Sequence, residues 1–539
     1  GYYSQHSTNY QLEVGKTYTL SFDYNFSSYS SESFGVGIGA GNGTIGSYAI
    51  DIIYQNNYTT FPQGRKVVTF TPTSTQLENY KYLAFRLVRA GSSVKVTANF
   101  SNFKLEEGAY ATEYEPYGAR NLPTNEDVYK EGYTLEGWYL DGAFTNRVTS
   151  LNGLTQDTTL YAKWVMATCG VETTSGKLYF DNLDDAFTYA LTNNDSKVII
   201  YKTNEEDCKI GLPITIPSGK TLTIVSSGVM SNIGVYANII NNGTLIIGGK
   251  TNSLNNLTFV VYDGCGIENS SNLTIYGGNF ERVEKDKSLI TTTGGSLKVL
   301  GGTFEDLVVD STNSFIKLAN TVANINDATM KNENTSSQKM FEVTENSVVT
   351  FDGETNILNP YGLIVDTSTE EAKSNVTINI NNGEYNGAMF IRVNNILNFN
   401  DGLIKQTDYN RAIHVAGQFN MFGGTIETEL STSFAGTAAY AINGNGGVVN
   451  IKGGNLKITA NNSNVTYVNI NATNGIVVVE NLTIQNTNTS SKGVYGFYLS
   501  NSTLTFNSGS VITSGASTGV YGIVSGNSSK VTINNGEFA

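Results

Sequence analysis

One short pattern of hydrophobic and polar positions recurs through the second half of the chain. In LTIYGGNF, which begins at Leu273, the apolar Leu273 and Ile275 alternate with Thr274 and Tyr276. Two glycines follow, and Phe280 resumes the apolar pattern. Alternation predicts a β-strand, and glycine predicts a tight corner because it accepts positive φ without steric cost. Related segments begin at 297, 322, 348, 378, 397, 419, 449, 477, 504 and 531. Each repeat is therefore predicted to be a strand, a corner and a second strand.

The spacing of these segments, 19 to 30 residues, selects the architecture. A leucine-rich repeat would keep a steadier length, and a propeller blade needs about 40 residues or more. One coil of a parallel β-helix has the right length and needs no helix. We therefore predict that residues 166–539 form a right-handed parallel β-helix of about twelve coils, with Gly277, Gly278, Gly301 and Gly302 at structural corners.

A short helix is predicted at the start of this solenoid. Leu183, Ala186 and Ala190 follow Asn182 at helical spacing, and Asp185 stands three residues after Asn182, which approximates a capping box. Such a helix would cover the open end of the first coil, as solenoids require. With the segment ITIPSGKTLTIVSSG after it, this arrangement resembles the pectin-lyase-like β-helices of large bacterial surface proteins.

Residues 1–119 alternate over longer stretches, which predicts antiparallel strands and a β-sandwich. The segments GKTYTLSFDY and VTANFSNFKLEEGAYATEYEPY resemble the two ends of a jelly-roll carbohydrate-binding module that is truncated at its start. The resemblance implies a glycan ligand and allows a structural calcium ion. Tyr54, Tyr58 and Phe61 are the candidate glycan-binding residues, because aromatic and amide side chains mix in YQNNYTTF. The alternative is that these rings pack onto the sandwich.

Residues 120–165 carry LP, GYT, GWY, D and TLYAKW in the order of the Listeria–Bacteroides repeat, also called the internalin B-repeat, which they resemble. The resemblance implies a small β-rich module found along extracellular bacterial surface proteins. So short a segment cannot hold a large core. Trp138 and Trp164 are therefore predicted to be structural residues that supply much of its buried area.

The charge and composition of the chain restrict the kinds of partner that it is expected to bind. Asp and Glu number 47 against 33 Lys and Arg, which gives a net charge of −14. Phosphate recognition needs a basic surface, so nucleic acid is not expected as a partner. No run of 18 apolar residues is present, so no membrane span is expected in this segment. We interpret the sequence as a piece of a longer chain with flanking domains.

Three cysteines, Cys169, Cys208 and Cys265, match no zinc spacing. They are expected to be buried small residues, and a Cys169–Cys208 disulfide is the alternative.

Catalytic chemistry is not expected. Carboxylates at equivalent positions of neighbouring coils would be the signature of a β-helical polysaccharide-cleaving enzyme, and few such positions are visible. His414 is expected to be an ordinary strand residue. The acidic pairs Asp184–Asp185 and Glu205–Glu206 fall in the predicted cap. No catalytic residue, metal ligand or cofactor is therefore assigned.

These features predict a non-catalytic extracellular protein of the bacterial cell surface that acts as an adhesin or a rigid stalk. Its expected partners are host or bacterial surface glycans or proteins, with glycan binding in residues 1–119. A phage fibre or receptor-binding protein is the alternative, and a β-helical polysaccharide lyase or hydrolase is a further one. The internalin-type repeat favours the cell-surface interpretation.

Overall fold

The structure is a computed structural model. It describes residues 3–6, 12–28, 34–41, 63–75, 82–89, 97–112, 114, 121–125, 127–151, 158–174, 176–193, 196–262, 264–284, 287–308, 313–332, 339–359, 362–365, 375–431, 434–489, 491–514 and 519–539. The chain divides into two compact units. One contains residues 1–123 and 138–161, and the other contains residues 124–137 and 162–539. The fold of the described residues is all-β, with a short helix at the start of the solenoid, as predicted.

The N-terminal unit contains two three-stranded antiparallel sheets, with orders β1-β5-β3 and β4-β2-β6. Their strands are β1 Tyr3–His6, β2 Tyr18–Ser28, β3 Phe34–Gly41, β4 Gln63–Phe70, β5 Tyr82–Arg89 and β6 Thr97–Glu107. Tyr18, Leu20 and Phe22 of β2 are buried, and the intervening Thr19 and Ser21 are buried as well, so this part of β2 is covered on both faces. The jelly-roll assignment stays a prediction.

A third small sheet has the order β8-β7-β9. It consists of β7 Tyr133–Tyr139, β8 Arg147–Val148 and β9 Tyr161–Met166, with β7 and β8 antiparallel.

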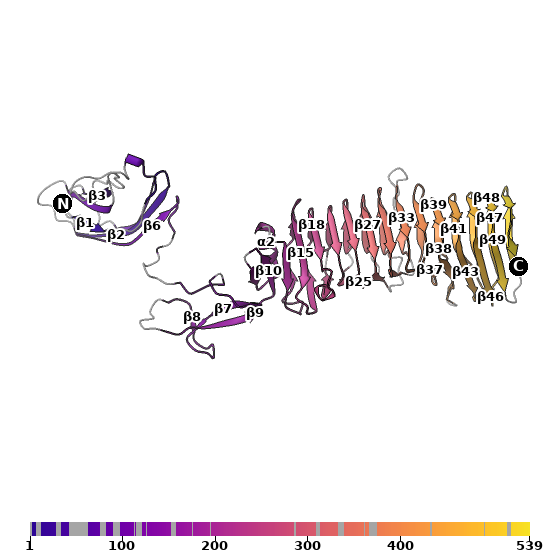
Figure 1. The fold of residues 1–539 in the computed structure, drawn as a ribbon, viewed down its shortest axis with the longest axis horizontal. Coiled ribbons are helices and arrows are strands. Elements are labelled where there is room, and N and C mark those ends of the chain that lie inside the picture. The colour runs from indigo at the N-terminus through magenta and orange to yellow at the C-terminus, as the bar shows by residue number, and fades with distance from the viewer. Residues whose placement is uncertain are drawn as a thin grey trace. The chain divides into compact units, whose positions relative to one another are not determined.

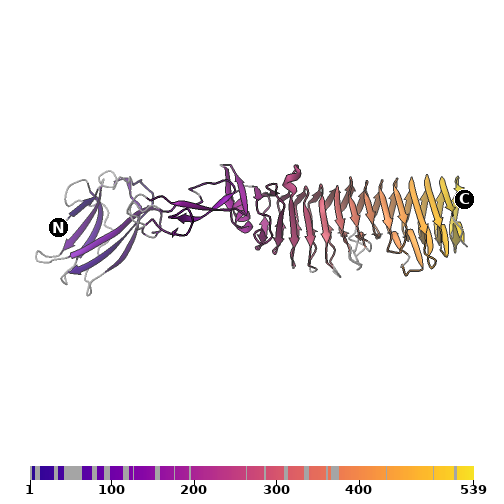
Figure 2. The ribbon, with the colours of Figure 1, turned by 90° about the horizontal axis from the view of Figure 1, so that it is seen from below.

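Residues from Lys197 onward form a right-handed-like β-solenoid of about twelve turns, which confirms the central prediction. Each turn contributes one strand to each of three parallel sheets, which we call sheets 1, 2 and 3. Figure 1 and Figure 2 show the strands of successive coils side by side, from magenta to yellow.

Sheet 1 begins with antiparallel β11 and β10 and continues with parallel strands. Its members are β10 Cys169–Thr173, β11 Gly176–Phe180, β12 Lys197–Ile200, β15 Thr221–Ser226, β18 Thr244–Ile247, β21 Asn272–Ile275, β24 Ser296–Val299, β27 Val322–Asn326, β30 Val348–Asp352, β33 Thr377–Ile380, β36 Ile396–Phe399, β39 Gln418–Met421, β42 Val448–Ile451, β45 Ile476–Val479, β48 Thr503–Phe506 and β51 Lys530–Ile533.

Sheet 2 consists of β13 Lys209–Ile210, β16 Ser231–Val235, β19 Leu257–Val261, β22 Asn279–Arg282, β25 Gly302–Asp306, β28 Ala328–Lys331, β31 Asn356–Leu358, β34 Glu384–Asn386, β37 Leu403–Gln406, β40 Thr425–Thr428, β43 Gly454–Ala460, β46 Leu482–Asn488, β49 Gly509–Ser514 and β52 Glu537–Phe538.

Sheet 3 consists of β14 Ile214–Ile216, β17 Ile239–Asn241, β20 Ile267–Asn269, β23 Ile290–Thr292, β26 Ile316–Ala319, β29 Phe341–Thr344, β32 Ile364–Val365, β35 Met389–Ile391, β38 Arg411–Val415, β41 Ala438–Asn445, β44 Thr466–Thr473, β47 Gly493–Ser500 and β50 Val520–Gly526. A 3₁₀ turn, η1 Asn252–Asn255, lies between β18 and β19.

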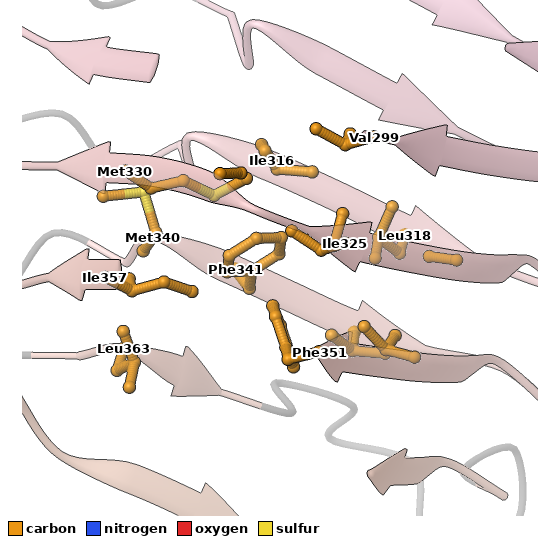
Figure 3. Packing of buried hydrophobic residues seen from close by; sticks show 14 of the residues in the cluster. Val299, Ile316, Leu318, Ile325, Met330, Met340, Phe341, Phe351, Ile357 and Leu363 are labelled. Carbon is orange, nitrogen blue, oxygen red and sulfur yellow. The ribbon is translucent and has the colours of Figure 1, made fainter. Parts of the chain in front are cut away.

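The solenoid core is built from equivalent residues stacked in register. Phe259, Phe280 and Phe304 pair across β19, β22 and β25, and their rings stack at centroid distances of 5.1 and 4.8 Å. Each such side chain contributes about 1.5–3 kcal/mol by leaving water. Contacts between different sheets add to these columns: Figure 3 shows Phe341 of β29 and Phe351 of β30 in the coil interior, where their rings meet edge to face with centroids 5.3 Å apart.

The predicted glycine corners lie between sheets 1 and 2. Gly278 and Gly302 have φ values of 106° and 105°, Gly301 has a φ of 153°, and Gly277 precedes Gly278. A Cβ on Gly278 would lie 2.9 Å from the Leu257 carbonyl oxygen of the preceding coil. Asparagine takes similar corners, as at Asn474 with a φ of 53°.

The capping helix α2 runs over Leu183–Asn193, as predicted. The Asp185 backbone N–H donates to Asn182 Oδ1 at 2.8 Å, and Asn182 Nδ2 donates back to the Asp185 carboxylate at 2.7 Å. The first bond caps the helix start in the manner of an N-cap residue, whereas the second joins the two side chains and takes the place of the backbone bond that would complete a capping box. Leu183, Ala186, Phe187 and Ala190 are buried beneath it.

All three cysteines are free thiols. Cys169 and Cys208 are buried, and Cys265 is half-buried. Burial raises the pKa of Cys208 to about 11, so this thiol stays protonated at neutral pH.

A buried ion pair inside the solenoid was not predicted. Arg282 and Asp306 stand opposite each other on β22 and β25 and are about 1% and 0% exposed. The guanidinium donates to both carboxylate oxygens, at 2.9 and 2.6 Å, and also to the backbone oxygens of Lys287 and Ser314. Burial raises the pKa of Asp306, and the hydrogen bonds from Arg282 oppose this effect.

Replacing Gly278 by Val should lower the free energy of unfolding by at least about 2 kcal/mol, because a side chain is strained at this φ and meets backbone. Replacing Thr274, which faces outward from β21, by Val should change it by less than about 0.5 kcal/mol. Thermal unfolding followed by circular dichroism checks the pair. Equal melting temperatures would contradict the corner geometry.

Replacing Arg282 by Met should cost about 3–5 kcal/mol of stability, because Asp306 would remain as an uncompensated buried charge. The double variant Arg282→Met with Asp306→Leu should recover a large part of that loss. Urea denaturation of the parent chain and the two variants measures this coupling. A double variant as unstable as the single one would show that the pair acts mainly through the backbone oxygens that Arg282 binds.

Candidate binding surface

The glycan-binding residues predicted from the sequence, Tyr54, Tyr58 and Phe61, lie outside the described residues. That site stays a prediction, as does the calcium ion in the same module.

The two tryptophans of the repeat module have structural surroundings. Trp138 is half-buried on β7 and donates from Nε1 to the Pro123 carbonyl oxygen at 2.7 Å. Its neighbour Tyr139 is buried and packs edge to face on Phe144. Trp164 is half-buried on β9, next to Lys163, which forms an ion pair with Glu136 at 2.7 Å.

Sheet 3 carries two outward rows of aromatic and polar side chains in the last coils of the solenoid. The first row passes through β35, β38, β41, β44 and β47, and the second begins on β38. We call these residues the aromatic–amide face: Phe390, His414, Asn443, Asn471 and Tyr498 in the first row, and Arg411, Tyr440, Tyr495 and Tyr521 in the second, where the buried Val468 of β44 lies between Tyr440 and Tyr495. β38, β41 and β47 are labelled in Figure 1.

Tyrosine rings form the C-terminal part of this face. Tyr495 and Tyr521 stack at 5.0 Å with an interplanar angle of 11°, whereas Tyr498 stands at 89° to Tyr495 with centroids 6.0 Å apart. Tyr498 is 43% exposed. The rings of Tyr495 and Tyr498 therefore pack edge to face on each other, and part of the Tyr498 side chain stays accessible to solvent.

Amides occupy the middle of the face. Asn471 Nδ2 donates to Asn443 Oδ1 at 2.7 Å, so the two side chains form a short ladder along the coils. A primary amide has two N–H donors and an oxygen with two lone pairs. The ladder uses one N–H and one lone pair, and both side chains stay partly exposed.

Arg411 and His414 form the N-terminal part of the face. Arg411 Nη1 lies 3.2 Å from His414 Nδ1. Because arginine can only donate, Nδ1 accepts and the imidazole proton resides on Nε2. Burial lowers the pKa of His414, and the positive charges of Arg411 and Arg392 lower it further. His414 is therefore a neutral donor at pH 7, beside the ring of Phe390 at 5.9 Å.

The coils widen where this face lies. Strands β17, β20 and β23 of sheet 3 have three residues each, whereas β41, β44 and β47 have eight. A separate hydrophobic cluster lies beneath the widened part. Its buried members are Leu430, Ala439, Ile458, Ala460, Val465, Tyr467 and Val494. The strands of sheet 3 from β14 to β35 have two to four residues each, so this extension is an addition to the basic coil.

One pair of carboxylates does occupy equivalent positions in neighbouring coils. Glu281 on β22 pairs in register with Glu305 on β25. Burial raises the pKa of Glu281, and the carboxylates of Glu305 and Glu205 raise it further. Glu305 forms an ion pair with Lys331 at 3.0 Å. The stacked rings of Tyr236 and Tyr262 lie near Glu205, to which the Tyr236 hydroxyl donates at 2.8 Å.

A pocket of about 350 Å³ lies beside the capping helix. Tyr129, Lys130, Tyr179, Asp185 and Tyr189 are among its lining residues. The hydroxyls of Tyr129 and Tyr179 are 3.1 Å apart, and this hydrogen bond raises the pKa of Tyr129 to about 12. The pocket therefore presents neutral phenols beside charged groups.

Two absences concern the described residues only. In the described ranges, no group of three or more His, Cys, Asp and Glu side chains is arranged to hold a metal ion. No helix in this part of the chain is long and apolar enough to cross a membrane.

Comparison with known protein families finds a match for one segment of the chain. Residues 102–163 match the Listeria–Bacteroides repeat domain, the family that the residues around TLYAKW resemble. The matched segment begins within β6. No curated protein and no solved structure matches the chain. The repeat is typical of surface proteins of bacteria, and the β-solenoid fits that class.

Sequence reasoning missed the aromatic–amide face. It treated His414 as an isolated strand residue. Because the coils differ in length, the spacing along the sequence does not show which residues of neighbouring coils stand side by side. Aligning RAIHVAG, AYAINGN, TYVNINAT and GVYGFYLS would have revealed the rows.

The lowered pKa of His414 predicts a pH-dependent stability. As pH falls below the ordinary histidine value of about 6.5, the unfolded chain binds a proton that the folded chain does not, so stability decreases. His414→Gln should lose this part of the decrease. Melting temperatures of both chains between about pH 7.5 and about pH 5.5 test it, and identical pH dependence of the two would contradict it.

Proposed function

We propose that this chain is part of a non-catalytic, extracellular bacterial surface protein in which the solenoid is a rigid stalk that presents adhesive surfaces. The observation that carries the proposal is the uninterrupted register of the coils. Sheet 2 pairs fourteen consecutive strands and sheet 3 pairs thirteen, all in parallel. A stack of this kind buries one continuous core, so bending it would break hydrogen bonds in several coils together.

The N-terminal module supports an adhesive role through its resemblance to carbohydrate-binding jelly rolls. The Listeria–Bacteroides repeat supports location at the bacterial surface, since such repeats are typical of surface proteins. A phage fibre is the alternative architecture that joins similar modules, and the repeat favours the cellular protein.

One observation favours an enzyme as the second candidate. The register pair Glu281 and Glu305 puts two carboxyl groups one coil apart, about 4.8 Å along the axis, and retaining glycosidases separate their carboxyl groups by about 5–5.5 Å. Against this, Glu305 forms an ion pair with Lys331, the next residue of the same row, which gives Glu305 a structural role.

Incubation with polygalacturonate, alginate and mucin glycans, with and without calcium, tests the non-catalytic proposal. Reducing ends and the absorbance of unsaturated products should stay at the level of a protein-free control. Product release by the parent chain that disappears in Glu281→Gln and Glu305→Gln, but persists in Glu427→Gln on the same row of sheet 2, would establish the enzyme instead.

A further inference from the structure

We propose that the aromatic–amide face binds a linear polysaccharide that lies along the solenoid axis across sheet 3. This site is separate from the predicted glycan site in residues 1–119, and its chemistry comes from the solenoid alone.

The side chains of the face match the two sides of a pyranose ring. Tyr498, which is 43% exposed beside Tyr495, offers aromatic surface to the C–H side of a sugar. Asn443 and Asn471 retain amide donors and acceptors for hydroxyl groups beyond the single bond that joins them. Such a combination of aromatic surface with a few placed polar groups is what orients small polar ligands.

The charge of the face differs from that of the chain. The chain has a net charge of −14, yet β38, β41, β44, β47 and β50 contain no Asp or Glu. Earlier strands of the same sheet do contain them, at Glu268 on β20 and Glu342 on β29. Arg411 adds a positive charge at one end of the face. The surface therefore does not repel an acidic sugar and does not require one.

The repeat of the coils suits a repeating ligand. Equivalent side chains recur about every 4.8 Å along the axis, and a pyranose unit has a similar length. A polysaccharide along the axis would therefore meet one coil for each sugar. The widening of sheet 3 from three to eight residues per strand occurs in these coils and provides a broad surface with its own buried support.

Titration of the full chain with cellohexaose, xylohexaose, mannohexaose, chitohexaose and hexagalacturonate tests the proposal by calorimetry. At least one should bind with a Kd below about 1 mM. Tyr498→Ala and Asn471→Ala should each weaken that binding about tenfold or more, which corresponds to about 1.4 kcal/mol.

Two matched controls separate binding from folding. Asn398 belongs to a similar amide ladder on sheet 1, where it donates to Asn379 at 2.8 Å, and Tyr161 of β9 is 44% exposed. Asn398→Ala and Tyr161→Ala should leave the affinity within about twofold. Arg411→Gln identifies the class of sugar, since it should weaken hexagalacturonate and spare a neutral hexasaccharide.

Three results would overturn the proposal: no binding of any of the five hexasaccharides, binding that the Tyr498 and Asn471 variants leave unchanged, or equal loss in the two controls. None of these results bears on the absence of turnover, so the non-catalytic proposal is tested independently.

Discussion

The register between successive coils is the constraint on which the rest of this structure depends. Each coil must place its buried residues over the equivalent residues of the preceding coil, because parallel hydrogen bonding fixes the spacing at about 4.8 Å. Inside, this produces columns such as Phe259, Phe280 and Phe304. On the outer surface, the same register aligns equivalent side chains of successive coils into rows. The ladder of Asn443 and Asn471, which continues to Tyr498, is one such row.

Coils of unequal length keep this register because their extra residues lie in the turns or, in β41, β44 and β47, in lengthened strands that stay paired with one another. The pair of Arg282 and Asp306 shows how such a turn is held. The guanidinium donates to backbone oxygens of two turns, at Lys287 and Ser314. A buried charge is expensive unless it is paired and fully hydrogen-bonded, and here the carboxylate of the next coil pairs with it. Irregular turns are thus compatible with an unbroken core.

The sequence was sufficient to predict the strands, the glycine corners and the cap, because each depends on neighbours in the chain. Alternation at Leu273 and Ile275, positive φ at Gly278 and the bond between Asn182 and Asp185 are all local. The ion pair and the aromatic–amide face could not be predicted in this way. Both depend on which residues of different coils stand opposite each other. Because the repeat length varies from 19 to 30 residues, the sequence alone does not determine that register. The jelly roll and its proposed glycan residues stay predictions.

The distance between two labels on one outward row tests the rigid register most directly. Val260 and Gln485 belong to the same row of sheet 2, nine coil pairings apart. Spin labels at Val260→Cys and Gln485→Cys, with Cys265→Ser to remove the half-buried thiol, should give one narrow distance distribution centred near 43 Å, since nine coils of about 4.8 Å span about 43 Å. A broad distribution, or several separate distances, would contradict a continuous and rigid stack of coils.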